Sequence, residues 1–401
     1  MPAPREVPDR RPGGGLATMA VVMAATHGTV DAYMGFLHPL LPRIMEKLGL
    51  SITLAATLVV VLSIASSVLQ PATGYLADRY GRRIYIAAGP ILAGIFASLI
   101  GLAPTFRILV LLLVLAGLGA ASFHPPGASS SARVSEGRGS GVRLSIFSFG
   151  GAVGYAVGPL LAVALVAWAG LEGMWVAMVP GVLIGLALLL LLPREPPRRD
   201  RQSPPSPAKV LSLLRGPLGI AFGISAVGTL LQRTYLTFEP IIVAEAGGSE
   251  ATGAAMLSIY LGAQALGTLA SGALTDRVDR RHILVGATIL GVPAHILAVL
   301  AAPAGPVAIS AAVAAGFLNM ALLPPLVVMA QEMMPEGTAI GSGIVMGLAW
   351  ATGSAAVLAA GVLGDQIGPV AAAAWTMPML LIGTLLAFHP ALQPYRRPQQ
   401  T

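Results

Sequence analysis

Five ionisable side chains within long apolar stretches of the sequence are candidates for chemistry. Asp31 and His27 lie four residues apart in the stretch 16–41, and His124 ends the stretch 107–124. Arg233 and Glu239 both lie in the stretch 217–242. An ionised side chain at the centre of a bilayer costs at least ~2.5 kcal/mol, so such residues usually face a cavity or a partner and often carry protons or substrate.

Asp31 and His27 are the first candidates for proton chemistry. In a helix they share one face, and Asp31 lies about 22 Å along its stretch at 1.5 Å per residue. A carboxyl and an imidazole at this spacing can hold and release a proton, although a purely structural hydrogen-bonded pair fits the same spacing. His124 and Glu239 are the next candidates, and the Pro residues that follow His124 suit a helix end equally well.

Arg233 is the strongest candidate for substrate binding. It lies at a depth that matches Asp31, so it could bind an anionic substrate or neutralise that carboxylate, or form a structural ion pair. Neutral polar residues could line the same cavity or join helices by hydrogen bonds, and these are Tyr33, Tyr155, Tyr235, Gln264 and Asn319.

The elements that position these residues are long apolar runs. Hydrophobic residues make up 55% of the 401 residues and charged residues only 10%, against about 25% in soluble domains. Runs of about 18–26 residues are long enough to cross about 30 Å of hydrocarbon, and continuous runs favour helices over a barrel. The sequence predicts an all-α membrane protein with twelve transmembrane helices, at 16–41, 54–76, 84–103, 107–124, 143–168, 174–192, 217–242, 252–275, 282–301, 306–329, 339–363 and 370–389.

The distribution of basic residues predicts the orientation. Of the 24 Lys and Arg, 20 fall in the tails and loops on one side of this topology. The positive-inside rule therefore places both termini in the cytoplasm of a cell inner (plasma) membrane, and it accounts for the net charge of +7 without nucleic acid.

The sequence lacks the residues that several classes of function require. The sequence has no Cys, which excludes disulfides and thiolate zinc sites. It has no Walker phosphate loop, no H-E-x-x-H and no G-x-S-x-G motif, so we expect neither an ATP-driven pump nor a hydrolase. We expect no enzyme activity, no cofactor and no metal site.

A Pro-rich charged segment divides the chain. Residues 193–209 are poor in apolar side chains and predict a flexible linker. The predicted organisation is a cytoplasmic tail at 1–15, six helices at 16–192, a linker at 193–216, six helices at 217–389 and a tail at 390–401.

An internal repeat relates the two halves. The segment Gly74–Arg83 recurs 198 residues later as Gly272–Arg281, with Gly, Leu, Asp and three Arg in register. Two parallel six-helix repeats are an architecture of secondary transporters, which bind substrate between the halves near the membrane midplane. The repeat therefore predicts pseudo-symmetric halves around a central site.

The first copy resembles the signature loop of the major facilitator superfamily, G-x-x-x-D-R-x-G-R-R. The matching residues are Gly74, Asp78, Arg79, Gly81, Arg82 and Arg83, and the second copy retains Gly272, Asp276, Arg277, Arg280 and Arg281 but has Asp279 in place of Gly. The resemblance implies the major facilitator fold and a latch, in which Asp78 meets the start of helix 11 near Ile340–Gly343. A helix N-terminus favours such an anion.

Two further resemblances concern the N-terminal half. Gly154, Gly158 and Pro159 resemble the motif of drug/proton antiporters, although a Gly-rich packing face with a Pro kink fits the same residues. Residues 20–165 are similar to the fosmidomycin-resistance group at His27–Asp31, Leu69-Gln70-Pro71, Phe123-His124-Pro125 and the run from Ser148 to Leu161, with Pro126 where that group has Glu.

These resemblances imply a secondary transporter, most simply a proton-coupled exporter of drugs or other small organic compounds. A symporter or uniporter, and an importer of a small organic anion that Arg233 would bind, are the alternatives, with a membrane channel as the rival from another class. The expected partners are a small-molecule substrate, protons and the lipid bilayer, and the resemblance implies a monomer.

Overall fold

The computed structural model describes residues 13–133, 140–193 and 206–397, and within these ranges the regular structure is helical with no strand. The N-terminal half contains α1 (Gly13–Met34), α2 (Leu41–Leu48), α3 (Ile52–Val68), α4 (Gln70–Tyr80), α5 (Arg82–Ser98), α6 (Phe106–Arg133), α7 (Ser140–Gly173) and α8 (Met178–Leu191). A 3₁₀ turn, η1 (His38–Leu40), precedes α2.

The C-terminal half begins with α9 (Pro207–Leu214) and α10 (Pro217–Glu245). It continues with α11 (Glu250–Thr275), α12 (Arg280–Leu300), α13 (Pro306–Met320), α14 (Leu323–Met333), α15 (Thr338–Gly343), a π-helical segment η5 (Ile344–Leu348), α16 (Ala349–Ile367), α17 (Pro369–Thr376) and α18 (Leu380–Ala387). A 3₁₀ turn, η7 (Pro390–Tyr395), ends it.

Local sequence accounts for many helix boundaries. Ser51 and Ser249 accept hydrogen bonds from backbone N–H groups at the starts of α3 and α11, as N-cap residues do. Gly49 ends α2 at φ +62°, where a residue without a side chain is favoured. Gly170, at φ +75°, breaks α7 close to its end and turns the chain toward α8.

Nine helical stretches of the described chain are long and apolar enough to cross a membrane, or ten if the bent pair formed by α9 and α10 is one span. One of the nine, Ser145–Leu191, is 47 residues long and contains the break at Gly170. The all-helical membrane fold is therefore confirmed, and the exact count of twelve stays a prediction.

Three predicted boundaries differ from the structure. The helix predicted to end at His124 continues to Arg133, with Pro125 and Pro126 inside it. Part of the predicted linker at 193–216 is the helix α9, capped by Ser206, whereas the linker residues 194–205 lie outside the described ranges. The predicted tail at 390–401 includes η7, and the Arg396 carbonyl accepts a hydrogen bond from the Arg280 backbone N–H at 2.7 Å.

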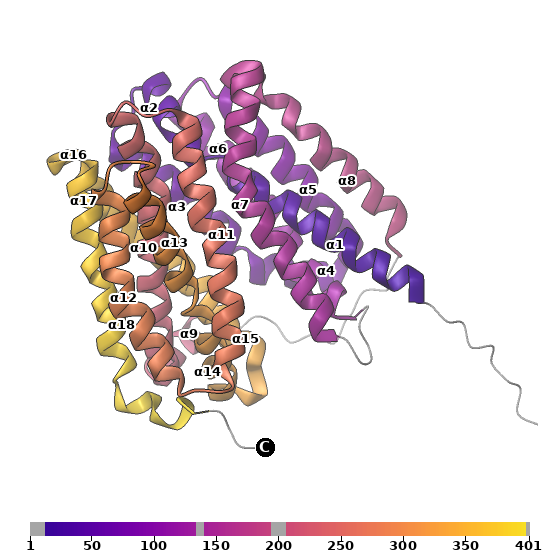
Figure 1. Cartoon of the computed structure of the whole chain (residues 1–401). Helices are drawn as coiled ribbons and strands as arrows, with labels where there is room; N and C mark the ends of the chain where they lie inside the picture. Colours follow the sequence, from indigo (N-terminus) through magenta and orange to yellow (C-terminus); the bar gives the residue numbers. More distant parts are fainter. Residues whose placement is uncertain (1–12, 134–139, 194–205, 398–401) are drawn as a thin grey trace, which may run out of the picture.

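Each half has its own apolar core, and the two cores meet at one face of the membrane, which we call the α2 face because α2 lies there (Figure 1). Ile52 and Ala56 of α3 pack into the core of the C-terminal half, and Ala254 of α11 packs into the core of the N-terminal half. The helices α9, α14 and α15 lie at the opposite, α9 face.

Polar contacts between the halves reinforce the α2 face. Arg43 Nε lies 2.6 Å from Glu250 Oε1. Asp365 at the end of α16 accepts hydrogen bonds from the backbone N–H groups of Ile52 and Thr53, at 2.7 and 3.1 Å. A carboxylate at a helix N-terminus is favourable, so Asp365 fastens α3 to the other half.

Inside the N-terminal half, α1 and α7 pack along a seam of small residues. A Cβ atom on Gly150, Gly154 or Gly158 would collide with the backbone carbonyl oxygens of Ala24, Gly28 and Ala32, one per turn. Glycine at this spacing allows two backbones to approach closely, as is common in membrane helix pairs. The packing alternative for the Gly154, Gly158 and Pro159 motif therefore has a direct geometric basis, and an additional transport role stays a prediction.

We expect Gly154→Ala to destabilise the protein, because the new methyl group meets the Gly28 backbone rather than a mobile side chain. Overpacking of this kind typically costs about 1–3 kcal/mol. The measurement is thermal unfolding in detergent. Gly286→Ala on α12 is the matched control, since a Cβ atom there has open space around it. Equal unfolding temperatures for the two variants would contradict the seam.

Candidate functional site

The structure brings three of the predicted proton-binding residues into one cluster. Asp31 of α1 lies between two imidazoles, with His27 Nε2 3.2 Å from its Oδ2 and His124 Nε2 3.0 Å from its Oδ1. His27 comes from the preceding turn of α1 and His124 from α6. The side chain of Asp31 keeps 20% of its exposure, so the cluster is partly accessible rather than sealed.

The outer nitrogens of the two rings determine where protons can lie. His27 Nδ1 is 2.8 Å from the Phe147 carbonyl oxygen, and His124 Nδ1 is 2.7 Å from the Ala120 carbonyl oxygen. A carbonyl only accepts, so we assign a proton to each Nδ1. Each Nε2 then faces a carboxyl oxygen, and each of these short contacts needs a proton on the nitrogen or on the oxygen. The cluster is therefore built to hold protons.

Packing keeps the cluster in place. The His27 ring stacks on Phe147 of α7 with centroids 4.2 Å apart. A Cβ atom on Gly151 would approach the His27 ring and come within 2.7 Å of Asp31 Oδ2, so a side chain there would displace these groups. The ligand atoms of the three cluster residues lie within 4.8 Å of one another, which is close enough to consider a metal ion. Because the contacts have hydrogen-bond lengths, we interpret the cluster as a hydrogen-bonded network.

Arg233 lies outside the Asp31 cluster. In this structure it contacts Tyr155 and not Asp31, so it does not neutralise that carboxylate as one prediction suggested. Arg233 Nη1 donates a hydrogen bond of 2.6 Å to the Tyr155 hydroxyl, which lies 3.4 Å from His38 Nε2. Arg233 therefore joins α10 to α7 across the two halves, whereas Asp31 faces α6. This contact also places Tyr155 in the interface between the halves.

Gln264 and Asn319 form an amide chain in the C-terminal half. Gln232 Nε2 donates to Gln264 Oε1 at 2.8 Å, Gln264 Nε2 to Asn319 Oδ1 at 3.1 Å, and Asn319 Nδ2 to the Gly228 carbonyl at 2.8 Å. These hydrogen-bonded amides join α10, α11 and α13. They support the interpretation that Gln264 and Asn319 form hydrogen bonds between helices. Sequence reasoning missed Gln232, although its position beside Arg233 was a signal.

The remaining polar candidates are buried. The Tyr33 hydroxyl donates to the Ala177 carbonyl at 2.6 Å and accepts from the Gly181 backbone N–H at 3.0 Å, so it anchors α1 to α8. Tyr235 is fully buried and stacks on Tyr260 with centroids 4.4 Å apart. Glu239, four residues after Tyr235 on α10, is 1% exposed and lies apart from the Asp31 cluster.

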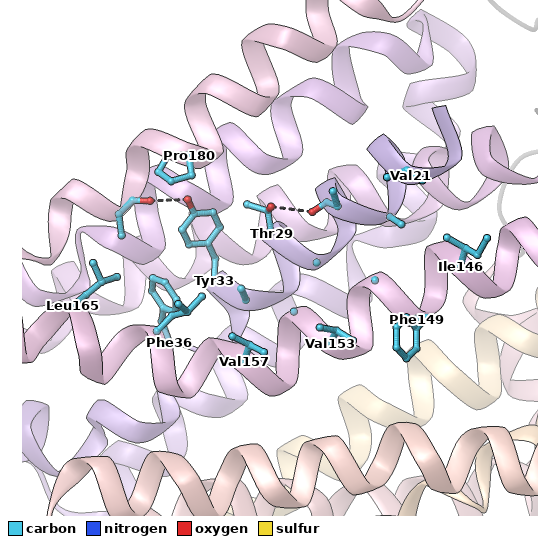
Figure 2. Close-up of a pocket in the computed structure, with 18 of the residues that line it drawn as sticks. Val21, Thr29, Tyr33, Phe36, Ile146, Phe149, Val153, Val157, Leu165 and Pro180 are labelled. Carbon is cyan, nitrogen blue, oxygen red and sulfur yellow. Dashed lines mark hydrogen bonds between the residues drawn. The ribbon is translucent and has the colours of Figure 1, made fainter. Parts of the chain in front are cut away.

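An apolar pocket of about 740 Å³ opens beside α1, α7 and α8 (Figure 2). Phe149, Val153 and Val157 of α7 form one wall, and Thr29 and Tyr33 of α1 lie across from them. The pocket occupies a different face of α1 from His27 and Asp31. Many of its lining side chains are exposed, as expected for groups that face lipid.

The two signature loops differ in their ion pairs. In the first copy, Arg82 pairs with Asp78 at hydrogen-bond distance, Gly74 packs against Pro125, and Gly81 adopts φ +109°, which favours Gly. Arg79 donates to Tyr75 at 3.1 Å. Among the described residues no hydrogen bond joins Asp78 to α15, which packs on α14 instead. The cross-half latch therefore stays a prediction.

In the second copy, Arg280 forms a bidentate pair with Glu332 of α14, at 2.6 and 2.9 Å, rather than with Asp276, which is exposed. Asp279 stands where the signature has Gly and caps α12 by accepting from the Arg281 backbone N–H at 2.9 Å. The remaining residues of the two signature loops are half-buried or exposed, namely Arg83, Gly272, Arg277 and Arg281.

Comparisons with known proteins match this architecture. The model of the Major Facilitator Superfamily matches residues 23–342. The fosmidomycin resistance protein of Escherichia coli (strain K12) is 25% identical over 351 residues, 86% of each chain. The uncharacterized MFS-type transporter YfnC of Bacillus subtilis (strain 168) is 26% identical over 406 residues, 96% of each chain.

Solved structures share the fold at low sequence identity. A bacterial homolog of the human lysosomal transporter Spinster, in an inward-facing and occupied conformation, has a TM-score of 0.76 and 16% identity, covering 94% of this chain and 97% of that one. The D-xylose-proton symporter has a TM-score of 0.69 and 16% identity, with 92% and 96% covered. The chain belongs to the Major Facilitator Superfamily and is a multi-pass membrane transport protein rather than an enzyme.

Proposed function

We propose that this transporter is a proton-coupled exporter of small organic compounds that acts by alternating access. It works as a monomer in the cell inner membrane, with both termini in the cytoplasm. The observation that carries the proposal is Asp31 held between His27 and His124, a partly exposed cluster that needs protons to satisfy its contacts. Similarity to the fosmidomycin resistance protein supports export.

With this orientation the α2 face is the outer face. The contacts Arg43–Glu250 and Asp365 with Ile52 and Thr53 then close the outer side. On the α9 face the ion pairs among the described residues, Asp78–Arg82, Arg280–Glu332 and Asp279–Arg396, each stay within one half. The structure is consequently an inward-facing state of the cycle.

Coupling follows from the charge of the cluster. A proton can shift a conformational equilibrium only if it binds the two states with different affinity. In the outward-facing state the cluster takes protons from an acidic exterior, and in the inward-facing state it releases them to a more alkaline cytoplasm. Substrate binds when protons leave, so the two ligands compete and move in opposite directions.

The walls of the apolar pocket and the contacts of Arg233 support one class of substrate. The pocket of about 740 Å³ has the size of a small-molecule site and mostly apolar, lipid-facing walls, which suit a compound that enters from the bilayer. Arg233, the main support for an importer of organic anions, already donates to Tyr155 between the halves. An apolar or amphipathic organic compound therefore fits this chain better than a small anion.

We expect Asp31→Asn to abolish proton-driven accumulation while substrate binding and substrate exchange persist. The amide keeps the size of the side chain but cannot exchange a proton with His27 or His124. The measurement is uptake into inverted vesicles across a panel of antibiotics and organic anions, with and without an imposed pH gradient. Glu46→Gln, an exposed carboxyl on α2, is the control. Concentrative uptake by Asp31→Asn would place the coupling proton elsewhere.

We expect Asp78→Ala to slow transport more than Asp276→Ala, with both variants inserted normally. Loss of Asp78 removes a carboxylate that pairs with the buried Arg82, which is 6% exposed. Asp276 is exposed, and the equivalent Arg280 is held by Glu332. Transport rates normalised to membrane expression test this order. Normal rates for a well-expressed Asp78→Ala variant would remove the signature loop from the mechanism.

A further inference from the structure

The outer part of α10 is enclosed on every side. Ten consecutive residues, 234–243, are buried, although only one stripe of a surface helix normally is. The helix α10 packs against η1, α2 and α3 of the N-terminal half and against α11, α16 and α17 of its own half. Phe238, for example, lies against Gly364 of α16. This segment is therefore the centre of the closed outer gate.

A carboxyl group lies within this enclosed segment without a partner. Glu239 is 1% exposed, and no hydrogen bond from any described residue reaches its buried Oε2. The nearby Tyr235 hydroxyl and Thr234 Oγ1 also lack partners among the described residues. Buried polar groups normally have partners, so an unsatisfied group of this kind needs an explanation.

The charged and titratable groups on the elements around α10 have other partners or lie toward the membrane surface. Arg43 pairs with Glu250, Lys47 with Glu172, and Asp365 binds the start of α3. His38 contacts Tyr155, His295 contacts Tyr260, and Arg233 donates to Tyr155. Glu46 of α2 is exposed, and the remaining charged groups lie at the α9 ends of their helices: Lys209, Arg280, Arg281, His282 and Glu332.

An ionised carboxylate without a partner is too costly in a buried environment. A buried carboxyl group of this kind binds a proton and becomes neutral. We propose that Glu239 is a second proton-binding site, and that the outer gate closes only when this carboxyl is protonated. Glu239 binds a proton when the outer gate is open to water on the α2 face, and closure of the gate then traps that proton. The proposal rests on the proposed function for the identification of the α2 face as the outer face.

This arrangement links the conformational equilibrium to pH in one direction. Alkaline conditions ionise Glu239 in the open gate, where water solvates it, and so oppose closure. Acidic conditions favour closure. Because a glutamine side chain resembles the protonated carboxyl in shape and has no charge, Glu239→Gln removes this dependence and keeps the gate closed.

The distance across the outer gate tests the proposal. The chain has no Cys, so spin labels on Glu46→Cys and Gln366→Cys, both at exposed positions on opposite halves, report this distance alone. Measured in detergent by pulsed electron resonance over a pH series, the long-distance population should rise severalfold from acid to alkaline pH. With Glu239→Gln added, the short distance should dominate at every pH.

Two controls separate the possible results. Glu245→Gln, an exposed carboxyl on the same helix, should leave the pH response unchanged. Asp31→Asn, measured in the same way, separates the contribution of the coupling cluster to the pH response from that of Glu239. A pH-independent distance in the labelled parent protein, or an unaltered pH response in Glu239→Gln, would overturn the proposal. The vesicle assay with Asp31→Asn judges the proposed function independently of these outcomes.

Discussion

A polar group inside a bilayer has no water to bind, so each one must find its partner within the protein or lose its charge. The buried side chains of this transporter follow that constraint. Asp31 contacts two histidines, and the Tyr33 hydroxyl forms hydrogen bonds with the Ala177 carbonyl and the Gly181 N–H. The side-chain amides of Gln264 and Asn319 form a hydrogen bond with each other. These contacts hold the helices of each half together, because apolar burial against lipid gives little drive for association.

The Asp31 cluster shows how this constraint turns into chemistry. Histidine rings anchored by carbonyls at Nδ1 present Nε2 to one carboxyl, so protons are required for the contacts to be favourable. Close packing is a precondition. The glycine seam lets α7 approach α1, and Gly151 leaves room for the His27 ring. The close approach of α1 and α7 therefore also shapes the site around His27 and Asp31.

The two halves share an architecture but divide the work differently. The N-terminal half contains the Asp31 cluster and the apolar pocket, whereas the C-terminal half contributes Arg233 and the buried Glu239. The signature loops differ in the same way. Arg82 pairs with Asp78 on the adjoining helix, and Arg280 instead pairs with Glu332 on α14. Sequence repeats preserve the helix positions, while side-chain partners have diverged.

The sequence by itself determined the class of the molecule. Long continuous apolar runs, few charges and the repeated signature loop are enough to predict a helical membrane transporter of this family, because hydrocarbon thickness and the cost of charge act on local sequence. The pairing of His27 with Asp31 could also be predicted, since residues four apart share a helix face.

Only the tertiary structure added His124 to that pair and moved Arg233 to Tyr155, because 93 residues separate His124 from Asp31 and 78 separate Arg233 from Tyr155. Contacts of that kind depend on how helices are rotated and packed. Burial of Glu239 without a partner among the described residues depends on the conformation as well, because elements of both halves enclose α10 at the α2 face. A sequence specifies the groups available, and the packing in each state determines which of them meet.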